Sequence, residues 1–317
     1  MIFSVSDSNA MAGFAILISV LGFAINSITL VAILLNNHVR KQLNTPYIIS
    51  VLCTDLLFCC FILPMRTSRY YKRQAEGSCN LSPFAFYISL GAFILSLMLL
   101  TIVRTCILFF QERTEKILKP WVRFMAISLC WLIPIAVMIP PMLGWYGKIG
   151  NVEYTQGCTL VPDEQGRSPE TILSNLFVFI PCTVMIICNI MIFAKLKVSS
   201  SVTDRKIVIF LLGTFFVFLF FLLTLIPSLM LTYVDNCFQF PGSHTIAYIV
   251  CWTGSLANPI IFLGMEKSYR DAIKVLVFKK LMLPIGSDEP DGGEMKTMRM
   301  KTFRARKQTG SADSISI

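Results

Sequence analysis

The stretch PFAFYISLGAFILSLMLLTIVR, residues 83–104, decides the fold. It carries no charged side chain before Arg104, its last residue. A helix needs about 20 apolar residues to cross the roughly 30 Å hydrocarbon core of a membrane, and this stretch is long enough. Backbone groups in lipid must find partners within their own segment, and the alternating pattern of a barrel strand is absent. The stretch is therefore predicted to be a membrane-spanning α-helix.

Six other apolar runs share these properties. Hydrophobic residues make up 55% of the 317-residue chain and charged residues 15%, whereas about a quarter of a soluble domain is charged. Asp55 is the one charged residue within the runs. We expect an all-α membrane protein, a bundle of seven transmembrane helices over residues 11–35, 47–64, 83–103, 124–143, 172–193, 207–231 and 245–264.

The distribution of basic residues predicts the orientation. A net charge of +10 is compatible with nucleic-acid binding, but the Lys and Arg residues gather in the connections after the first, third and fifth runs and after the seventh. Basic loops remain cytoplasmic, so the N-terminus is predicted outside and the C-terminus inside. The basic surplus then faces anionic lipid, and nucleic acid is not an expected partner.

Four regions follow from this pattern. Residues 1–10 are expected to be extracellular, 11–264 to form the receptor-like bundle, 265–283 an amphipathic helix on the membrane surface, and 284–317 a disordered cytoplasmic tail. The first run is predicted to be a signal-anchor rather than a cleaved signal peptide. Hydroxyls in the tail favour phosphorylation and an arrestin-type partner, and the terminal residues 315–317 resemble a short PDZ ligand.

Most cysteines are predicted to be small buried hydrophobes inside the runs. Cys79, Cys158 and Cys237 face the oxidising side, where one disulfide can form among them. The favoured pair is Cys79, at the start of the third run, with Cys158, in the loop 144–171. This bond would strap the loop over the bundle as a lid and leave Cys237 free.

Particular residues within the runs resemble the rhodopsin-like (class A) G-protein-coupled receptors. The hallmarks fall in the expected order, and the spacing from Cys79 to Arg104 also matches. The segments 55–61, DLLFCCF, and 139–144, IPPMLG, are similar to the Moody and Trapped-in-endoderm group of arthropod receptors. The resemblance implies a switch network of Asn26, Asp55, Trp131, Pro181, Pro227, Asn258, Pro259 and Phe262.

The resemblance also implies a G-protein docking surface that contains Arg104, Thr105, Lys195 and Lys197. The family has a carboxylate before this arginine, and here that position is Val103. Such a carboxylate helps to hold the arginine in the resting state, so its loss raises the hypothesis of elevated basal activity. The motif that ends in Pro227 lacks the tryptophan that the family usually has there, and Phe262 replaces a tyrosine. These two changes predict an altered internal network.

Asp55 and Asn258 are expected to face each other in the middle of the bundle, with Ser255 one turn away. A carboxylate at that depth is costly and usually functional. The family resemblance implies a sodium or water site here, although Phe93 replaces a common hydroxyl. The alternative, a carboxyl group satisfied by Asn26 and Asn258 without an ion, stays open.

The residues of the third and seventh runs limit the chemical class of the ligand. The third run has no outer aspartate for a monoamine, and the seventh has no lysine for retinal, so no cofactor is expected. The resemblance places aromatic residues in the outer cavity and arginines at its rim, which suits a lipid or another acidic amphiphile. The alternative is that these arginines reach out to water or lipid phosphate. The predicted pocket is Arg66, Arg69, Phe86, Tyr87, Arg167, Tyr248 and Trp252.

Two other function classes fit the sequence less well. A seven-helix transporter or channel needs chains of intramembrane ionisable groups, and one aspartate is a poor match. A hydrolase needs a nucleophile with a base at the same depth, and no histidine lies well inside a run. The sequence therefore favours a non-enzymatic plasma-membrane receptor whose partners are an extracellular ligand and a heterotrimeric G protein.

Overall fold

The computed structural model describes residues 5–72, 81–152, 157–167, 169, 172–173, 175–198, 243–265 and 267–276. Residues up to Ile273 form one compact unit, and the chain from Lys274 onward is a second. The predicted sixth span, with Pro227, lies outside the described residues. So do Cys79, Cys237, the tail, and the side chains of Arg66, Arg69, Cys158, Lys197 and Tyr248.

The predicted helical fold is confirmed for the described part of the chain. The first two spans are α1 (Val5–Leu35) and the continuous series α3 (Thr45–Leu57), η1 (Phe58–Ile62) and α4 (Leu63–Lys72), with the short α2 (Asn37–Arg40) between them. The next two are α5 (Leu81–Ile117) and α6 (Pro120–Leu143). The fifth is η3 (Asn175–Phe179) with α8 (Ile180–Val198), and the seventh is α10 (Ser243–Met265). Finally, α11 (Lys267–Leu276) covers part of the predicted surface helix.

Five helical segments of the described chain are long and apolar enough to cross a membrane. They are Asn9–Leu35, Thr45–Met65, Leu81–Phe110, Pro120–Leu143 and Asn175–Lys195. Large apolar side chains such as Phe124 and Ile190 are 74% and 63% exposed. Polar side chains such as Asn26 and Asn258 are buried instead. Apolar groups outside and polar groups within are typical of a bundle whose solvent is lipid.

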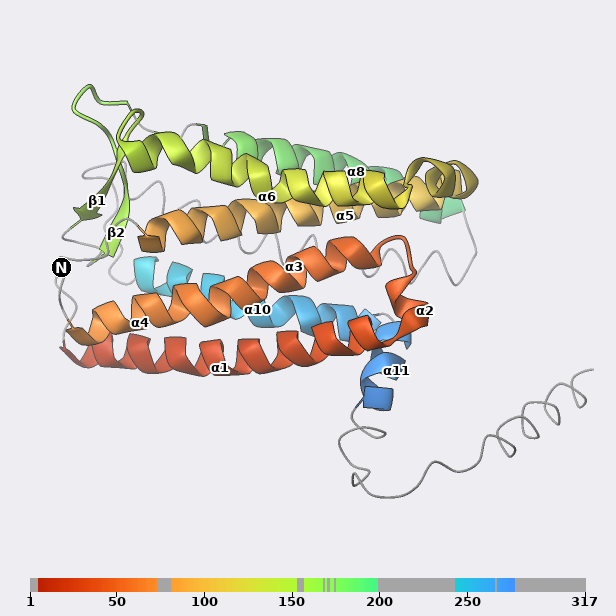
Figure 1. Cartoon of the computed structure of the whole chain (residues 1–317), viewed down its shortest axis with the longest axis horizontal. Helices are drawn as coiled ribbons and strands as arrows, with labels where there is room; N and C mark the ends of the chain where they lie inside the picture. The colour runs from red at the N-terminus through yellow and green to blue at the C-terminus, as the bar shows by residue number, and fades with distance from the viewer. Residues whose placement is uncertain are drawn as a thin grey trace, which may run out of the picture. The chain divides into compact units, whose positions relative to one another are not determined.

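The helix α5 lies at the centre of the packing. It contacts α3, α6 and α8, while α1 packs against α3, α4 and α10 (Figure 1). Glycines permit the closest approaches. A Cβ atom on Gly22 of α1 would lie 2.4 Å from the sulfur of Cys59, and one on Gly91 of α5 would lie 2.8 Å from Pro134 of α6. Small residues let membrane helices pack backbone against backbone, so these positions fix the helix spacing.

In the described part of the chain, two wide π-helical turns interrupt the helices, and each precedes a proline. Residues 58–62 come before Pro64, and residues 175–179 come before Pro181. Proline cannot donate the helical hydrogen bond, and its ring crowds the carbonyl group one turn earlier. The hydroxyl of Ser19 on α1 donates a 2.6 Å hydrogen bond to the carbonyl oxygen of Cys59. A neighbouring helix therefore helps to satisfy the backbone at the first irregular turn.

The loop after α6 contains strands that the sequence did not predict. β1 (Lys148–Val152) pairs antiparallel with β2 (Gly157–Val161), with Lys148 opposite Val161 and Asn151 opposite Cys158. β1 contacts α6 and β2 contacts α5. The loop was predicted only as a lid tied by a disulfide. A short hairpin lacks a long alternating pattern, so its strands were not visible in the sequence.

Candidate functional site

The buried polar centre joins α3 to α10. The side-chain nitrogen of Asn258 donates a 2.9 Å hydrogen bond to Oδ2 of Asp55, and both side chains are buried. Asn26 of α1 donates to the carbonyl oxygens of Gly22 and Ser255, at 2.8 and 3.0 Å. Among the described residues no donor reaches Asn26 Oδ1. This acceptor would suit a water molecule or a cation. Asp55 is hydrogen-bonded by Asn258, whereas the amide group of Asn26 donates to backbone carbonyl groups instead of to Asp55, contrary to the ion-free alternative.

A second polar chain crosses the bundle from α6 to α5. Trp131 Nε1 donates to the Ser50 hydroxyl at 3.1 Å, and the Ser50 and Ser96 hydroxyls are 2.8 Å apart. The sequence singled out Trp131 but missed both serines, because their pairing depends on the rotation of three helices. Buried hydroxyl bonds of this kind fix how neighbouring helices face one another.

Arg104 and Thr105 lie in the second half of α5 and are 5% and 6% exposed. Thr105 donates to the carbonyl oxygen of Thr101 at 2.8 Å. Farther along, Phe110 has non-helical angles, φ −139° and ψ 48°. The Lys195 ammonium group of α8 donates to the carbonyl oxygen of Leu108 and lies 4.7 Å from the centre of the Phe109 ring. The structure therefore brings Lys195 to α5 near Arg104.

The aromatic residues predicted for the outer pocket lie in two places. Phe86 and Tyr87 of α5 meet edge to face with centroids 5.4 Å apart, and Phe58 of η1 lies 6.3 Å from Phe86. Trp252 of α10 is 1% exposed and stacks on Phe14 of α1 at 6.3 Å. The first group lies between η1 and α5, whereas Trp252 packs toward α1. Aromatic contacts of this kind contribute about 0.5–1.5 kcal/mol each beyond burial.

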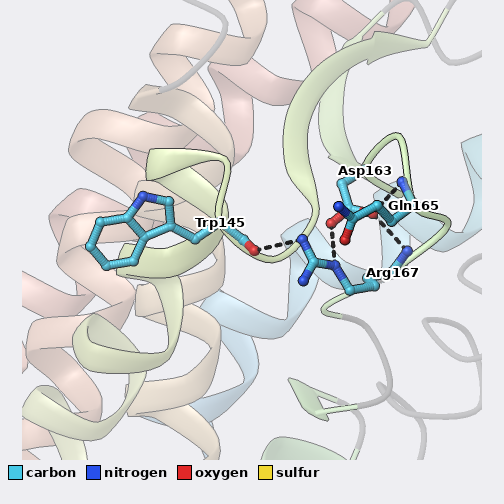
Figure 2. Close-up of polar contacts among 4 residues, drawn as sticks. All are labelled: Trp145, Asp163, Gln165 and Arg167. Carbon is cyan, nitrogen blue, oxygen red and sulfur yellow. Dashed lines mark hydrogen bonds and ion pairs between the residues drawn. The ribbon is translucent and has the colours of Figure 1, made fainter.

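Arg167 is held within the loop that follows α6, as Figure 2 shows. Its Nε lies 2.7 Å from Oδ2 of Asp163, and its Nη2 donates to the carbonyl oxygen of Trp145 at 3.1 Å. Asp163 Oδ1 accepts the backbone N–H groups of Gln165 and Arg167 at 3.0 and 2.8 Å. Gly166 has φ +72°, which favours glycine. The segment DEQGR, residues 163–167, is a turn signal that sequence reading could have found.

Two opposing effects set the pKa of Asp163. Desolvation is the largest single influence and raises it, but the N–H groups and guanidinium of Arg167 and the N–H group of Gln165 together hold the pKa of this carboxyl below its usual range. The charged form is therefore favoured. The guanidinium also lies 5.9 Å from the Tyr146 ring. Together these contacts fasten the hairpin to the end of α6, and the arrangement is here called the loop clasp.

Comparison of the sequence with known proteins identifies the family. Residues 25–262 match the family model described as "7 transmembrane receptor (rhodopsin family)". The chain belongs to this family. As a rhodopsin-family receptor it is a multi-pass membrane protein with G-protein-coupled receptor function.

Three relatives show the range of the similarity. Protein trapped in endoderm-1 of Drosophila melanogaster is 28% identical, over 80% of this chain and 73% of that protein. The G-protein coupled receptor moody of the same species is 26% identical, over 90% of this chain and 54% of the relative, so this chain spans about half of moody's length. Rhodopsin of Abyssocottus korotneffi is 25% identical, over 82% of this chain and 96% of that protein. The predicted resemblance to the Moody and Trapped-in-endoderm group is confirmed.

Proposed function

We propose that this receptor converts an outer-face binding event into nucleotide exchange on a heterotrimeric G protein at the plasma membrane. Its N-terminus would be outside and its C-terminus inside. The supporting observation is that Arg104 is buried near the inner end of α5. Farther along the same helix, the carbonyl group of Leu108 accepts a hydrogen bond from Lys195. A cation buried in an apolar bundle is costly and usually functional.

The proposed switch uses the two polar chains that connect the helices. Asp55 and Asn258 join α3 to α10, and Trp131, Ser50 and Ser96 join α6, α3 and α5. A ligand and a G protein that both prefer a second arrangement of these helices would favour each other's binding. The coupling free energy is then the difference in each partner's affinity for the two states.

The proposed ligand is lipid-like or another amphiphile with an acidic head. The proposal is supported by the aromatic rings of Phe58, Phe86 and Tyr87, which meet between η1 and α5 and could provide an apolar contact surface. Arg66 and Arg69 belong to α4, which follows η1 directly. Arg167 already has Asp163 as an ion-pair partner, so its contribution to binding must be measured separately.

The regions around the bundle complete the proposal. Residues 1–10 and 265–317 would be the outer terminus, the surface helix and the cytoplasmic tail. The tail would receive arrestin-type and PDZ partners. Val103, where the family has a carboxylate, supports a raised basal activity.

A panel of heterotrimeric G proteins tests the central claim. Purified receptor in lipid nanodiscs should accelerate GTPγS uptake by at least one G protein without added ligand, and Arg104→Ala should abolish this while the thermal melting temperature stays within a few degrees. If no G protein responds with or without candidate acidic amphiphiles, the coupling proposal fails. Arg66→Ala, Arg69→Ala and Arg167→Ala, made singly, then test the acidic head through agonist potency.

A further inference from the structure

Two buried polar atoms lie unpaired where α3 and α6 begin. In the described part of the chain, neither Tyr47 Oη nor Arg123 Nε has a hydrogen-bond partner. Tyr47 is 0% exposed, and Arg123 as a whole is half-buried. A buried donor without a hydrogen-bond partner destabilises the fold, and the penalty is larger when the group is charged. Two such atoms together indicate a missing partner.

The two residues belong to one site. The charge of Arg123 acts electrostatically on the Tyr47 hydroxyl, and α3 packs against α6. The Trp131 to Ser50 hydrogen bond fastens the same two helices farther along. Ser50 follows Tyr47 by about one helical turn, and Trp131 follows Arg123 by about two. The unpaired atoms therefore lie on the facing sides of adjacent helices.

The chemistry of these atoms specifies the partner. A guanidinium group has only donors, and a phenol can donate, so the missing group must accept hydrogen bonds. The Arg123 charge favours an anion, and among the described residues its guanidinium forms no ion pair. Lys119 at the start of α6 offers no side-chain cap to the first N–H groups. A helix N-terminus with free N–H groups attracts phosphate.

The surroundings indicate a lipid phosphate rather than a free one. Pro120 is the first residue of a candidate membrane span, so Arg123 lies at its boundary. The neighbouring Trp121 and Phe124 are 64% and 74% exposed. Tryptophan is enriched where headgroups meet hydrocarbon, and these two side chains could cover acyl chains below a headgroup.

We propose that Tyr47, Arg123 and the first turn of α6 bind the phosphate of an anionic phospholipid at the cytoplasmic surface. Assignment to the inner leaflet rests on the orientation in the proposed function. The phosphate accepts hydrogen bonds from Tyr47 Oη and Arg123 Nε and so bridges α3 and α6. The bound lipid stabilises this pair of helices as a structural ligand.

Native mass spectrometry of the purified full-length receptor tests the site. Receptor in detergent is titrated with phosphatidic acid, with phosphatidylcholine of the same acyl chains, and with inorganic phosphate. Phosphatidic acid should remain bound and raise the melting temperature, because a ligand that binds only the folded state stabilises it. Equal binding of phosphatidylcholine would overturn the proposal, and equal protection by inorganic phosphate would overturn the assignment to lipid.

Variants locate the site. Tyr47→Phe, which removes one oxygen and keeps the ring, and Arg123→Gln should each weaken phosphatidic acid binding on the order of tenfold. Arg113→Gln removes the same charge from an exposed position and should leave the affinity within about twofold. If Arg123→Gln fails to fold, the phosphatidic acid affinity of Tyr47→Phe alone decides whether the site is correct. Unchanged affinity in Tyr47→Phe, or an equal loss in Arg113→Gln, would overturn the site.

The result stands apart from the test of G-protein coupling. Lipid retention is measured without a G protein, and detergent presents the lipid to both ends of the bundle. Loss of binding in Tyr47→Phe with normal GTPγS uptake would support the lipid site alone. Absence of uptake with intact, variant-sensitive lipid binding would remove the proposed function and leave the phosphate site in place.

Discussion

The ammonium group of Lys195 donates a hydrogen bond to the carbonyl oxygen of Leu108 and lies over the Phe109 ring. It thereby joins the end of α8 to α5 just before the irregular turn at Phe110. The family resemblance assigned Lys195 to the G-protein surface. The geometry adds a role within the receptor, because movement of α8 away from α5 must break this bond.

Lys195→Met should therefore raise ligand-free GTPγS uptake, since it keeps the apolar stem and removes the bond to Leu108. We expect an increase of about two- to tenfold, as loss of one charge-assisted hydrogen bond shifts a two-state equilibrium by that order. Phe109→Leu keeps the bond to the carbonyl group and should have a smaller effect. A decrease in uptake by Lys195→Met would mean that this lysine mainly contacts the G protein.

Val103→Asp should lower basal uptake by placing a carboxylate beside Arg104. Val103 is 3% exposed, so the new charge would be buried next to a buried cation and should hold it in the resting arrangement. Val103→Asn has the same size without the charge and serves as the control. Equal uptake by the two variants would remove the idea that the missing carboxylate raises basal activity.

A double-mutant cycle on Asp55 and Asn258 should show favourable coupling. Asn258→Ala leaves the buried Asp55 carboxyl without its 2.9 Å partner, whereas Asp55→Ala with Asn258→Ala removes both groups. We expect an interaction energy of about 0.5–2 kcal/mol from thermal melting in nanodiscs. Simple additivity of the two single variants would show that this bond does not stabilise the α3–α10 contact.

The contribution of the loop clasp to stability should depend on pH only in acid. The pKa of Asp163 is lowered in the folded protein, so its contribution is complete above the unfolded value, about 3.9, and is lost as the pH falls through the lower folded value. The difference in melting temperature between wild type and Asp163→Asn should be constant from pH 8 to about pH 5 and should vanish in stronger acid.

The neighbouring variant Glu164→Gln controls for a general loss of negative charge. It removes an exposed carboxylate from the same turn and should melt like the wild type across that range. If the melting difference between wild type and Asp163→Asn begins to shrink near neutral pH rather than below about pH 5, the effect comes from another group and the loop clasp is not its source.

Gly22→Ala should destabilise the α1–η1 contact, and a second change should reverse the effect. A Cβ atom at Gly22 would lie 2.4 Å from the Cys59 sulfur, and overpacking of this kind costs about 1–3 kcal/mol. Cys59→Ala removes that sulfur, so the double variant Gly22→Ala with Cys59→Ala should melt above Gly22→Ala alone. Failure of this rescue would show that the limiting contact is elsewhere.

The family and the helical spans were predictable because lipid makes the constraint local. Each spanning segment must satisfy its own backbone and expose apolar side chains, so every run can be recognised without knowing its neighbours. This explains why the limits of α6 and α10 lie within a few residues of the predicted runs. α1 begins earlier than residue 11, since the helix extends into the more polar residues before the run.

Tertiary structure alone decided which polar groups meet. These contacts depend on how each helix is rotated about its axis. They are the chain of Ser50, Ser96 and Trp131, the bond from Ser19 to Cys59, the bond from Lys195 to Leu108, and the placement of the unpaired Tyr47 and Arg123 atoms. Hydropathy fixes the length of a membrane helix but barely constrains that rotation, because lipid and protein interior are similarly apolar. Close packing at glycine positions and a few hydrogen bonds set the rotation, and both involve residues far apart in the chain.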